Sequence, residues 1–449
     1  MVGLKASLNE QEEKLQCKKG AIVIPTEEAG TYDVIVVGGG LSGVCAAVAS
    51  ARTGARTLLV EALPSVGGNG TTGLPISGLC ARNSNKIIVQ GIVSEILHRL
   101  CSRNGSCSDF FCKRWIPIDA EQLQIVLGEI LESANVDVLT YSPLLAVVSE
   151  QSTLREAIFY NKDGCALRYQ AKMFVDATGD AQVARLAGIT TVMGRQHDGL
   201  TQTMSLVFSV AGIDESRAPA NDIVVDLWHK LQDTGHIKLN QRRNPSFNSM
   251  IHRPGWRSLI ATRVQVPKGT DNRFLSQAEL IGRKQVDEFI ESFLHPHVPG
   301  YEGCFLAQIA GHIGVRETRR IVGLYEITAE DLLMGRKHAD AIACNASSIE
   351  NHKADSSSTE WQHLRDGEYY TVPLRALVAL EATNLFACGR CISATHEALA
   401  ALRVLSPSMA TGQAAGTAAA LAALKRLSSH DLDPNLVRGA LAVAGAVID

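Results

Sequence analysis

A glycine-rich turn near the start of the chain has the residue types and spacing of a dinucleotide-binding site. The turn follows the apolar run 33–37 and opens the helical pattern 41–53, so strand, turn and helix come in the required order. Its Gly-x-Gly-x-x-Gly pattern includes Gly38, Gly40, Leu41, Ser42 and Gly43. Such glycines allow a tight turn, close approach of a pyrophosphate and close helix packing, and the helix N-terminus offers N–H groups to phosphate. Glu61 ends the next apolar run and is expected to accept hydrogen bonds from a ribose.

Three further segments favour FAD over NAD, and each resembles a segment of flavoproteins in the fumarate-reductase-like superfamily. The loop after Glu61 is expected to follow the pyrophosphate through Gly67, Gly68, Asn69, Gly70 and Thr71. A strand end is expected to pass close to the nucleotide at Ala177, Thr178, Gly179 and Asp180. The C-terminal stretch is expected to contact the flavin at Gly389, Arg390, Gly412, Gln413 and Ala414. A helix beginning near Ser408 would then direct its positive end at the flavin and stabilise negative charge on it.

Nearly the whole chain, from about Tyr32 to the last helix, resembles the FAD-dependent oxidoreductases related to fumarate reductase flavoproteins. Segments 314–323, 327–331 and 372–374 also match. The resemblance implies an α/β protein with a Rossmann-like FAD-binding domain, made of a parallel sheet plus a β-meander, and an inserted α+β substrate or capping domain. We expect the FAD-binding domain at 1–197 and 370–449 and the capping domain at 198–369. No fingerprint of a covalent flavin link is present, so non-covalent FAD is expected.

His396 and Arg403 are the catalytic candidates, because the resemblance places a His and an Arg over the flavin in this region. A histidine can act as a general acid or base near neutral pH, and an arginine can bind a carboxylate or stabilise developing negative charge. The alternative is that His396 packs or caps a helix while Arg403 pairs with a phosphate or carboxylate. Substrate-anion binding is also expected from a second set, Arg316, Arg319 and Arg320, unless these residues form an ion-pair network between domains.

The function expected from these residues is hydride transfer between a small organic substrate and flavin N5. A dehydrogenase or oxidase of a carboxylate, a sugar-like molecule or a natural-product intermediate fits. One alternative is an electron-transfer flavoprotein subunit of a larger redox complex with no substrate of its own, and another is a flavin-binding protein that has lost catalysis. Only one dinucleotide fingerprint is present, so the electron acceptor is external and open: oxygen, a quinone or a protein.

Composition limits the possible partners. The 449 residues are 46% apolar and 20% charged, with a formal net charge of −3, which makes nucleic acid an unexpected partner. The eleven cysteines are scattered and match no zinc pattern, so we expect reduced thiols and no metal site, including at the CxxC of Cys388 and Cys391. No run is long enough to span a bilayer and the N-terminus is polar, so a cytoplasmic location is expected, with a homodimer as an option.

The periodicity predicts the elements that position these motifs. Buried parallel strands are expected at 33–37 and 57–60, a β-meander at 136–176, strand-like structure at 200–213 and a short strand at 21–25. Helices are expected at 85–103, 119–134, 222–232, 276–294, 331–344 and 408–427. Residues 351–368 are polar and are expected to form a surface loop.

Overall fold

The main sheet of the protein has seven strands and a parallel centre. The structure is a computed structural model that describes residues 24–113, 115–237, 241–250, 252–355 and 358–449. Its parallel strands are β5 (Asp137–Leu139), β2 (Thr57–Val60), β1 (Thr26–Val37), β8 (Ala166–Asp176) and β19 (Leu385–Ala387). The antiparallel meander β6 (Leu144–Glu150) and β7 (Thr153–Tyr160) continues from β8. This arrangement confirms the predicted Rossmann-like sheet with a β-meander.

Strand β1 is buried on both faces, as its continuous apolar sequence predicts. Val34 and Val36 belong to one hydrophobic cluster, and Ile35 and Val37 belong to another. Because side chains of a strand alternate between faces, the two clusters lie on opposite sides of the sheet. On the first side pack α1 (Leu41–Arg52) and α10 (Leu405–Lys425), followed by α2 (Ile92–Ser102), α3 (Ala120–Ser133) and α11 (Pro434–Val443). On the other side lies α4 (Gln182–Leu186).

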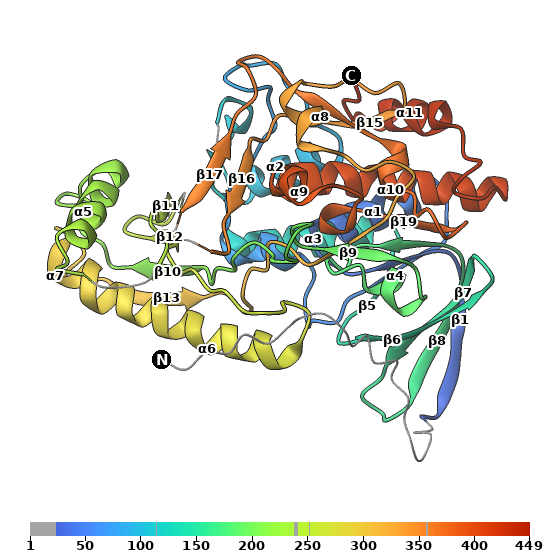
Figure 1. Ribbon diagram of the computed structural model, residues 1–449, viewed down its shortest axis with the longest axis horizontal. Coiled ribbons are helices and arrows are strands. Elements are labelled where there is room, and N and C mark those ends of the chain that lie inside the picture. The colour runs from blue at the N-terminus through green and yellow to red at the C-terminus, as the bar shows by residue number, and fades with distance from the viewer. Residues whose placement is uncertain (1–23, 114, 238–240, 251, 356–357) are drawn as a thin grey trace.

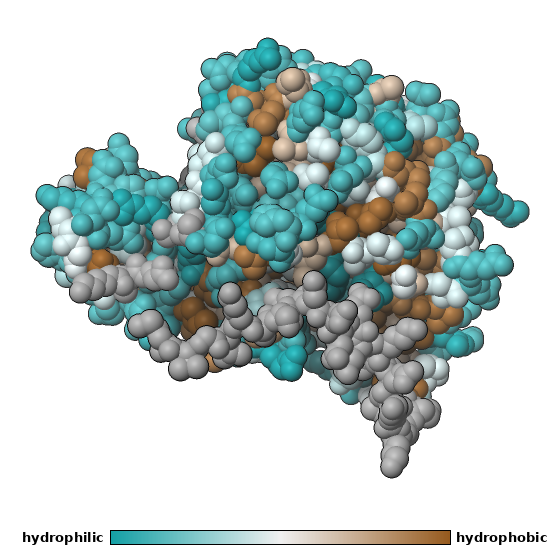
Figure 2. Space-filling model, viewed as in Figure 1, coloured by the Kyte–Doolittle hydropathy of each residue, from teal (hydrophilic) through white to brown (hydrophobic). Residues whose placement is uncertain are grey.

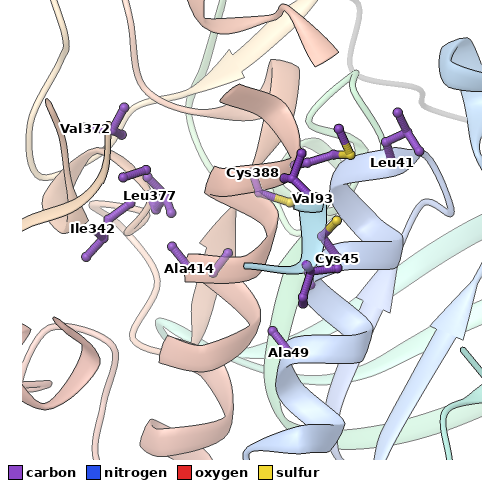
Figure 3. Packing of buried hydrophobic residues seen from close by; sticks show 14 of the residues in the cluster. Leu41, Cys45, Ala49, Val93, Ile342, Val372, Leu377, Cys388 and Ala414 are labelled. Carbon is purple, nitrogen blue, oxygen red and sulfur yellow. The ribbon is translucent and has the colours of Figure 1, made fainter. Parts of the chain in front are cut away.

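Helices α1 and α10 pack at unusually short range (Figure 3). A Cβ added to Gly412 would lie 2.1 Å from the backbone oxygen of Ser42, and one added to Gly416 would lie 1.9 Å from that of Ala46. Small residues therefore allow the backbones of these helices to touch, and α10 is apolar on nearly all sides because it is buried.

A second unit has its own sheet and core (Figure 1). Its antiparallel strands are β11 (Ser246–Ser249), β12 (Arg257–Ile260), β10 (Phe208–Ala211) and β13 (Phe305–Ile309). Helices α5 (Asn221–Asp233) and α6 (Asn272–Phe289) accompany them, and the buried core spans residues 204–313. The face of this unit visible in Figure 2 is largely hydrophilic, as expected when its aromatic side chains are turned inward.

The segment after residue 327 corrects two predictions. The predicted helix 331–344 is wrong: α8 (Ala329–Leu333) lasts little more than one turn, and β15 (Ala341–Asn345) pairs with β18 (Tyr370–Pro373). Gly335, with a φ of +62°, redirects the chain after α8. The predicted loop 351–368 is wrong in part, because β16 (Ile349–His352) and β17 (Thr359–Gln362) form a hairpin there, while 363–368 are coil and turn. Side chains of β15 and β16 join the core of the main sheet.

Other differences concern the ends of elements. Helix α2 begins at Ile92, and α6 begins after its cap Asp271 and continues into a π-helical turn, η3 (Ile290–Leu294). Only 208–211 of the stretch 200–213 form a strand, and α10 begins at Leu405. Most of the strand predicted at 21–25 lies outside the described residues. No helix in the described ranges is both long and apolar enough to cross a membrane.

Candidate active site

The glycines of the predicted nucleotide turn have different structural reasons to be glycine. Gly38 has a φ of +101°, and an added Cβ would lie 2.5 Å from the backbone oxygen of Ala177. At Gly43 an added Cβ would lie 1.8 Å from the backbone oxygen of Gly38. Gly40 has an ordinary φ of −61°, and an added Cβ would meet nothing within 4 Å. Protein packing therefore explains Gly38 and Gly43, whereas at Gly40 the chain leaves open space at the N-terminus of α1, which fits the approach of a pyrophosphate.

Glu61 is buried and is hydrogen-bonded to the backbone of the glycine turn. Its carboxylate accepts hydrogen bonds from the backbone N–H of Gly39 at 2.5 Å and of Leu63 at 2.8 Å. Burial raises the pKa of Glu61, and the two backbone N–H groups oppose that rise. The carboxylate thus fixes the end of β2 against the glycine turn, and contact with a ribose stays a prediction.

The other predicted nucleotide segments meet the turn in space, although they are far apart in the sequence. A Cβ on Gly68 would lie 3.2 Å from the Cα of Gly40, and one on Gly389 would lie 2.6 Å from Ser42 Oγ. One on Gly179 would lie 2.2 Å from Nη2 of Arg390. All three other predicted segments therefore converge with the turn, with Gly389 and Arg390 representing the C-terminal one.

Side chains reinforce this convergence. Arg390 is ion-paired with Asp180, with 3.8 Å between Nη1 and Oδ1, and Thr318 Oγ1 donates to the same carboxylate at 2.6 Å. On the loop after β2, Asn69 Oδ1 lies 3.1 Å from Nε2 of His312. Burial lowers the pKa of His312, which favours its neutral form.

The α10 residues predicted to touch the flavin face the protein interior instead. Gly412 packs on α1, and Ala414 is fully buried in the core (Figure 3). Gln413 is 2% exposed, and its Oε1 accepts a hydrogen bond from the N–H of Ile92 at the start of α2. The small residues of α10 thus serve helix packing in this structure, in place of the expected approach of the flavin.

A cavity of about 530 Å³ extends from the nucleotide end between the two units. The main unit contributes Asn69, Arg390, Arg403 and the start of α10, and the second unit contributes Val207 and Phe247. Arg316, which follows the second unit in the chain, also lines the cavity. A volume of this size accommodates a small organic molecule.

Arginines dominate the charged part of the cavity wall. Arg316 donates to the backbone oxygen of Thr203 at 2.6 Å and to Ser205 Oγ at 3.0 Å. Arg403 donates to Gln202 Oε1 at 3.0 Å and to the backbone oxygen of Glu350 at 3.0 Å. In the described part of the chain neither guanidinium is ion-paired with a carboxylate. Burial, together with the neighbouring arginines, lowers the pKa of Arg316 well below its usual value, and burial lowers that of Arg403 to about 10.

Sequence reasoning missed three residues of this wall: Arg242, His352 and Glu350. The carboxylate of Glu350 lies 3.4 Å from Arg242 Nη2 and 3.1 Å from His352 Nε2. Burial and the surrounding arginines hold the pKa of His352 well below its usual range, so its imidazole is neutral at pH 7. The remaining carboxylates of the wall, on Asp222 and Asp226, are exposed on α5. No local pattern marks these positions as one site, because Arg242 comes from a loop and Glu350 and His352 come from β16, more than 100 residues later.

His396 is placed differently from Arg403. It is 5% exposed and lies beside the fully buried Glu317, with 2.8 Å between Nδ1 and the carboxylate. Of the described residues that line the cavity, Arg403 is one and His396 is not. Glu317 also accepts from the backbone N–H of Gln202, which in turn holds Arg403. His396 therefore belongs to the network that supports the arginine.

The three arginines predicted to form one anion site point to three places. Only Arg316 reaches the cavity. Arg319 donates to the backbone oxygen of Asp180 at 2.9 Å, and the buried Arg320 pairs with Glu317 at 2.6 Å. Consecutive residues of the short strand β14 (Arg319–Ile321) face opposite sides, which separates Arg319 from Arg320.

Both cysteines of the CxxC motif lie in the protein core. Cys388 and Cys391 are fully buried, and burial raises the pKa of Cys388 to about 12 and that of Cys391 well above its usual value. Sγ of Cys391 accepts hydrogen bonds from the N–H groups of Gly179 and Ala181. Nine cysteines whose side chains the structure describes are free thiols, and no cluster with metal-ligand chemistry occurs among the described residues. Two buried, reduced thiols agree with the structural interpretation of this motif.

The fold and the converging glycine segments define a nucleotide-binding α/β protein of the flavin-dependent class. The model of the family "FAD dependent oxidoreductase" matches residues 33–441, and the chain belongs to this family. FAD is its cofactor, and the protein is an enzyme. The membership confirms the FAD-dependent part of the predicted resemblance, while a particular relationship to fumarate reductase flavoproteins stays a prediction.

Two curated proteins are similar to part of the chain. The digeranylgeranylglycerophospholipid reductases of Thermoplasma volcanium and Thermoplasma acidophilum are 29% identical over 183 residues and 30% identical over 184 residues. Each match covers 37% of this chain and 44% of the relative, so the chain spans less than half the length of these relatives.

Solved structures with a similar chain path include a geranylgeranyl bacteriochlorophyll reductase-like protein of Thermoplasma acidophilum. It is 16% identical, with a TM-score of 0.44 over 92% of this chain and 83% of that chain. An anhydrotetracycline hydroxylase of Streptomyces rimosus is 12% identical, with a TM-score of 0.43 over 92% of this chain and 66% of that chain.

Proposed function

We propose that this enzyme transfers a hydride between FAD and a small organic anion held in the cavity between its two units. One observation carries the proposal: Arg316 and Arg403 face the cavity with hydrogen bonds only to neutral oxygen atoms. Two partly buried guanidinium groups without a carboxylate partner are costly, and a bound anion would remove much of that cost. A carboxylate is the substrate group that best fits such planar donors.

The residues proposed to hold FAD are those of the converging segments, from the glycine turn and Glu61 to Asp180 and Arg390. FAD, once bound, supplies the acceptor or donor of the electron pair. We further propose that the capping unit comprises about residues 204–313, the extent of the second core, in place of the expected 198–369. It would close the cavity with Val207 and Phe247, and Arg316, just after it in the chain, would be an anion-binding residue.

Within this proposal the network behind Arg403 has a positioning role. Glu317 fixes the backbone of Gln202, and Gln202 fixes the guanidinium of Arg403. His396, first expected to move a proton, would act with Glu317 to keep this arrangement, because its imidazole is tied to that carboxylate. The exchange His396→Ala would then raise the KM for the substrate through Arg403, whereas a direct proton-transfer role predicts a loss in kcat at saturating substrate.

The test is anaerobic reduction of the holoenzyme by a panel of small carboxylates and phosphates, followed in the visible flavin absorbance band. Arg316→Ala and Arg403→Ala should each weaken the apparent affinity for an active anion roughly 10- to 150-fold, the effect of losing one charge-assisted hydrogen bond. Arg273→Ala is the matched control, because Arg273 is highly exposed and far from the wall of the cavity. Unchanged affinity in both cavity variants would refute the anion site. Flavin that only a protein partner reduces would favour the electron-transfer subunit.

A further inference from the structure

A second, smaller pocket adjoins the cavity. It has a volume of about 280 Å³, and we call it the outer pocket. It shares four wall residues with the cavity: Ser77, Trp115, Glu350 and Val404. The same side chains bound both spaces, so the outer pocket lies directly beside the cavity that Arg316 lines.

Two antiparallel strand pairs each contribute an indole ring to the outer pocket. In one, β3 (Ile76–Ser77) and β4 (Trp115–Ile116) place Trp115 opposite Ser77. In the other, β16 and β17 place Trp361 opposite Glu350. Each tryptophan is thus the cross-strand partner of a residue on the shared wall.

Both tryptophans are more than one third exposed. Trp115 is 47% exposed and Trp361 is 39% exposed, whereas Trp228 in the core of the second unit is fully buried. Phe111 adds a third aromatic ring to the wall. Large aromatic faces left open around a pocket are suited to binding a flat apolar ring.

The polar groups of the outer pocket are largely satisfied within the protein. Asn83 donates to Asp366, and Ser348 is hydrogen-bonded to His363. The two cations, Arg82 and Lys113, are ion-paired with aspartates. Among the described residues of this wall, neither cation is therefore left unpaired for a second anionic group.

We infer that the outer pocket binds an aromatic ring at the far end of the same substrate whose anionic group lies against Arg316. The substrate class is then an arylalkyl carboxylate or a similar aromatic acid. This inference rests on the proposed function, because it takes the cavity as the anion-binding part of the site.

The test compares two probes with one carboxylate each, butyrate and 4-phenylbutyrate. Dissociation constants are measured on the FAD-loaded enzyme from the change in its flavin spectrum. The wild type should bind 4-phenylbutyrate more tightly than butyrate. Trp115→Ala and Trp361→Ala should each reduce that preference about 2- to 10-fold, the worth of one aromatic pair. Trp361 lines only the outer pocket, so Trp361→Ala should leave butyrate binding unchanged. Trp361→Phe should retain most of the preference.

Tyr141→Ala is the matched control, because Tyr141 is 49% exposed and lines neither space. Equal affinity for the two probes in the wild type, or an unchanged preference in both alanine variants, overturns the inference, as does failure of either probe to bind. Arg316→Ala separates the two proposals. If this variant binds both probes as tightly as the wild type while the tryptophan variants lose the preference, the anion site fails and the aromatic pocket stands.

Discussion

Replacement of Gly40 by alanine should remove FAD without unfolding the protein. Gly40 is the N-cap of α1, with φ −61° and ψ 175°, a backbone conformation open to alanine, and the new Cβ would meet no protein atom within 4 Å. Alanine at an N-cap destabilises a helix by up to about 1 kcal/mol relative to better caps. The exchange of glycine for alanine also lowers the conformational entropy of the unfolded chain, which stabilises the folded protein by about 0.4–1 kcal/mol. The free energy of unfolding of the FAD-free protein should therefore change by less than about 1 kcal/mol.

The same methyl group would occupy the space through which a pyrophosphate approaches the N-terminus of α1. Loss of one charge-assisted hydrogen bond costs about 1.5–3 kcal/mol, so the dissociation constant for FAD should rise roughly 10- to 150-fold. Titration of the FAD-free protein, followed by quenching of flavin fluorescence, measures this constant, and thermal unfolding of the same sample measures stability.

Two further glycines serve as references for this experiment. Gly128→Ala, in α3, has equally open space and should affect neither FAD binding nor folding adversely. Gly43→Ala should destabilise the protein itself by at least about 1–3 kcal/mol, because its Cβ would lie 1.8 Å from a backbone oxygen. If Gly40→Ala binds FAD as tightly as the wild type, the pyrophosphate does not pass this turn and the reasoning is refuted.

Three other predictions test the supporting structure. Gly412→Ala should lower the thermal midpoint of unfolding by an amount equivalent to about 1–3 kcal/mol, because its Cβ would lie 2.1 Å from a carbonyl oxygen of α1. Gly439→Ala, where the added Cβ meets open space, should leave the midpoint unchanged. Equal midpoints for the two variants would contradict the packing role of Gly412. Glu61→Ala should cost about 1–3 kcal/mol of stability, measured by denaturant unfolding without FAD, because the N–H of Gly39 loses its buried acceptor; no loss would count against this bond. Because the pKa of His352 is lowered in the folded protein, His352 of the unfolded chain takes up a proton near pH 6.5, before the folded protein does. The contribution of His352 to the free energy of unfolding is therefore present above that pH and is lost below it, by at most about 1.4 kcal/mol per pH unit. His352→Asn should flatten the fall of the thermal midpoint between about pH 6.5 and pH 5, and an unchanged slope would contradict this sign.

The nucleotide end of the molecule was predictable from the sequence because its signals are local. Strand, glycine turn, helix and acidic residue follow one another from residue 33 to Glu61. Each can be identified from its hydrophobic periodicity or its residue type, without knowledge of distant contacts. The C-terminal segment was found because Gly389 and Arg390 directly follow a buried strand. The segment at 331–344 misled the prediction because its composition favours a helix, while pairing with β18 and burial against α10 impose a strand.

The wall of the cavity was not predictable in the same way. Arg242, Arg316 and Arg403 come from three distant parts of the chain, and the spacing of charges along the sequence carries no information on which of them meet. The cluster at 316–320 shows the opposite error: arginines adjacent in sequence were grouped, but the alternation of a short strand sends Arg319 and Arg320 to different sides. Charge becomes evidence for a site only when burial and partners are known.

Glycine is the residue for which sequence and structure have to be combined. A glycine in a motif can be required by a positive φ, by a neighbouring backbone or by a ligand, and the letter is the same in each case. The structure separates the three: Gly38 has the positive φ, while Gly43 and Gly412 touch other backbones. Gly40 has an ordinary φ and empty space around it, so neither of the first two reasons applies there. Gly128 and Gly439 also have open space, but Gly40 is the one of the three motif glycines that protein packing does not require, and this is why we propose that the pyrophosphate of FAD passes there.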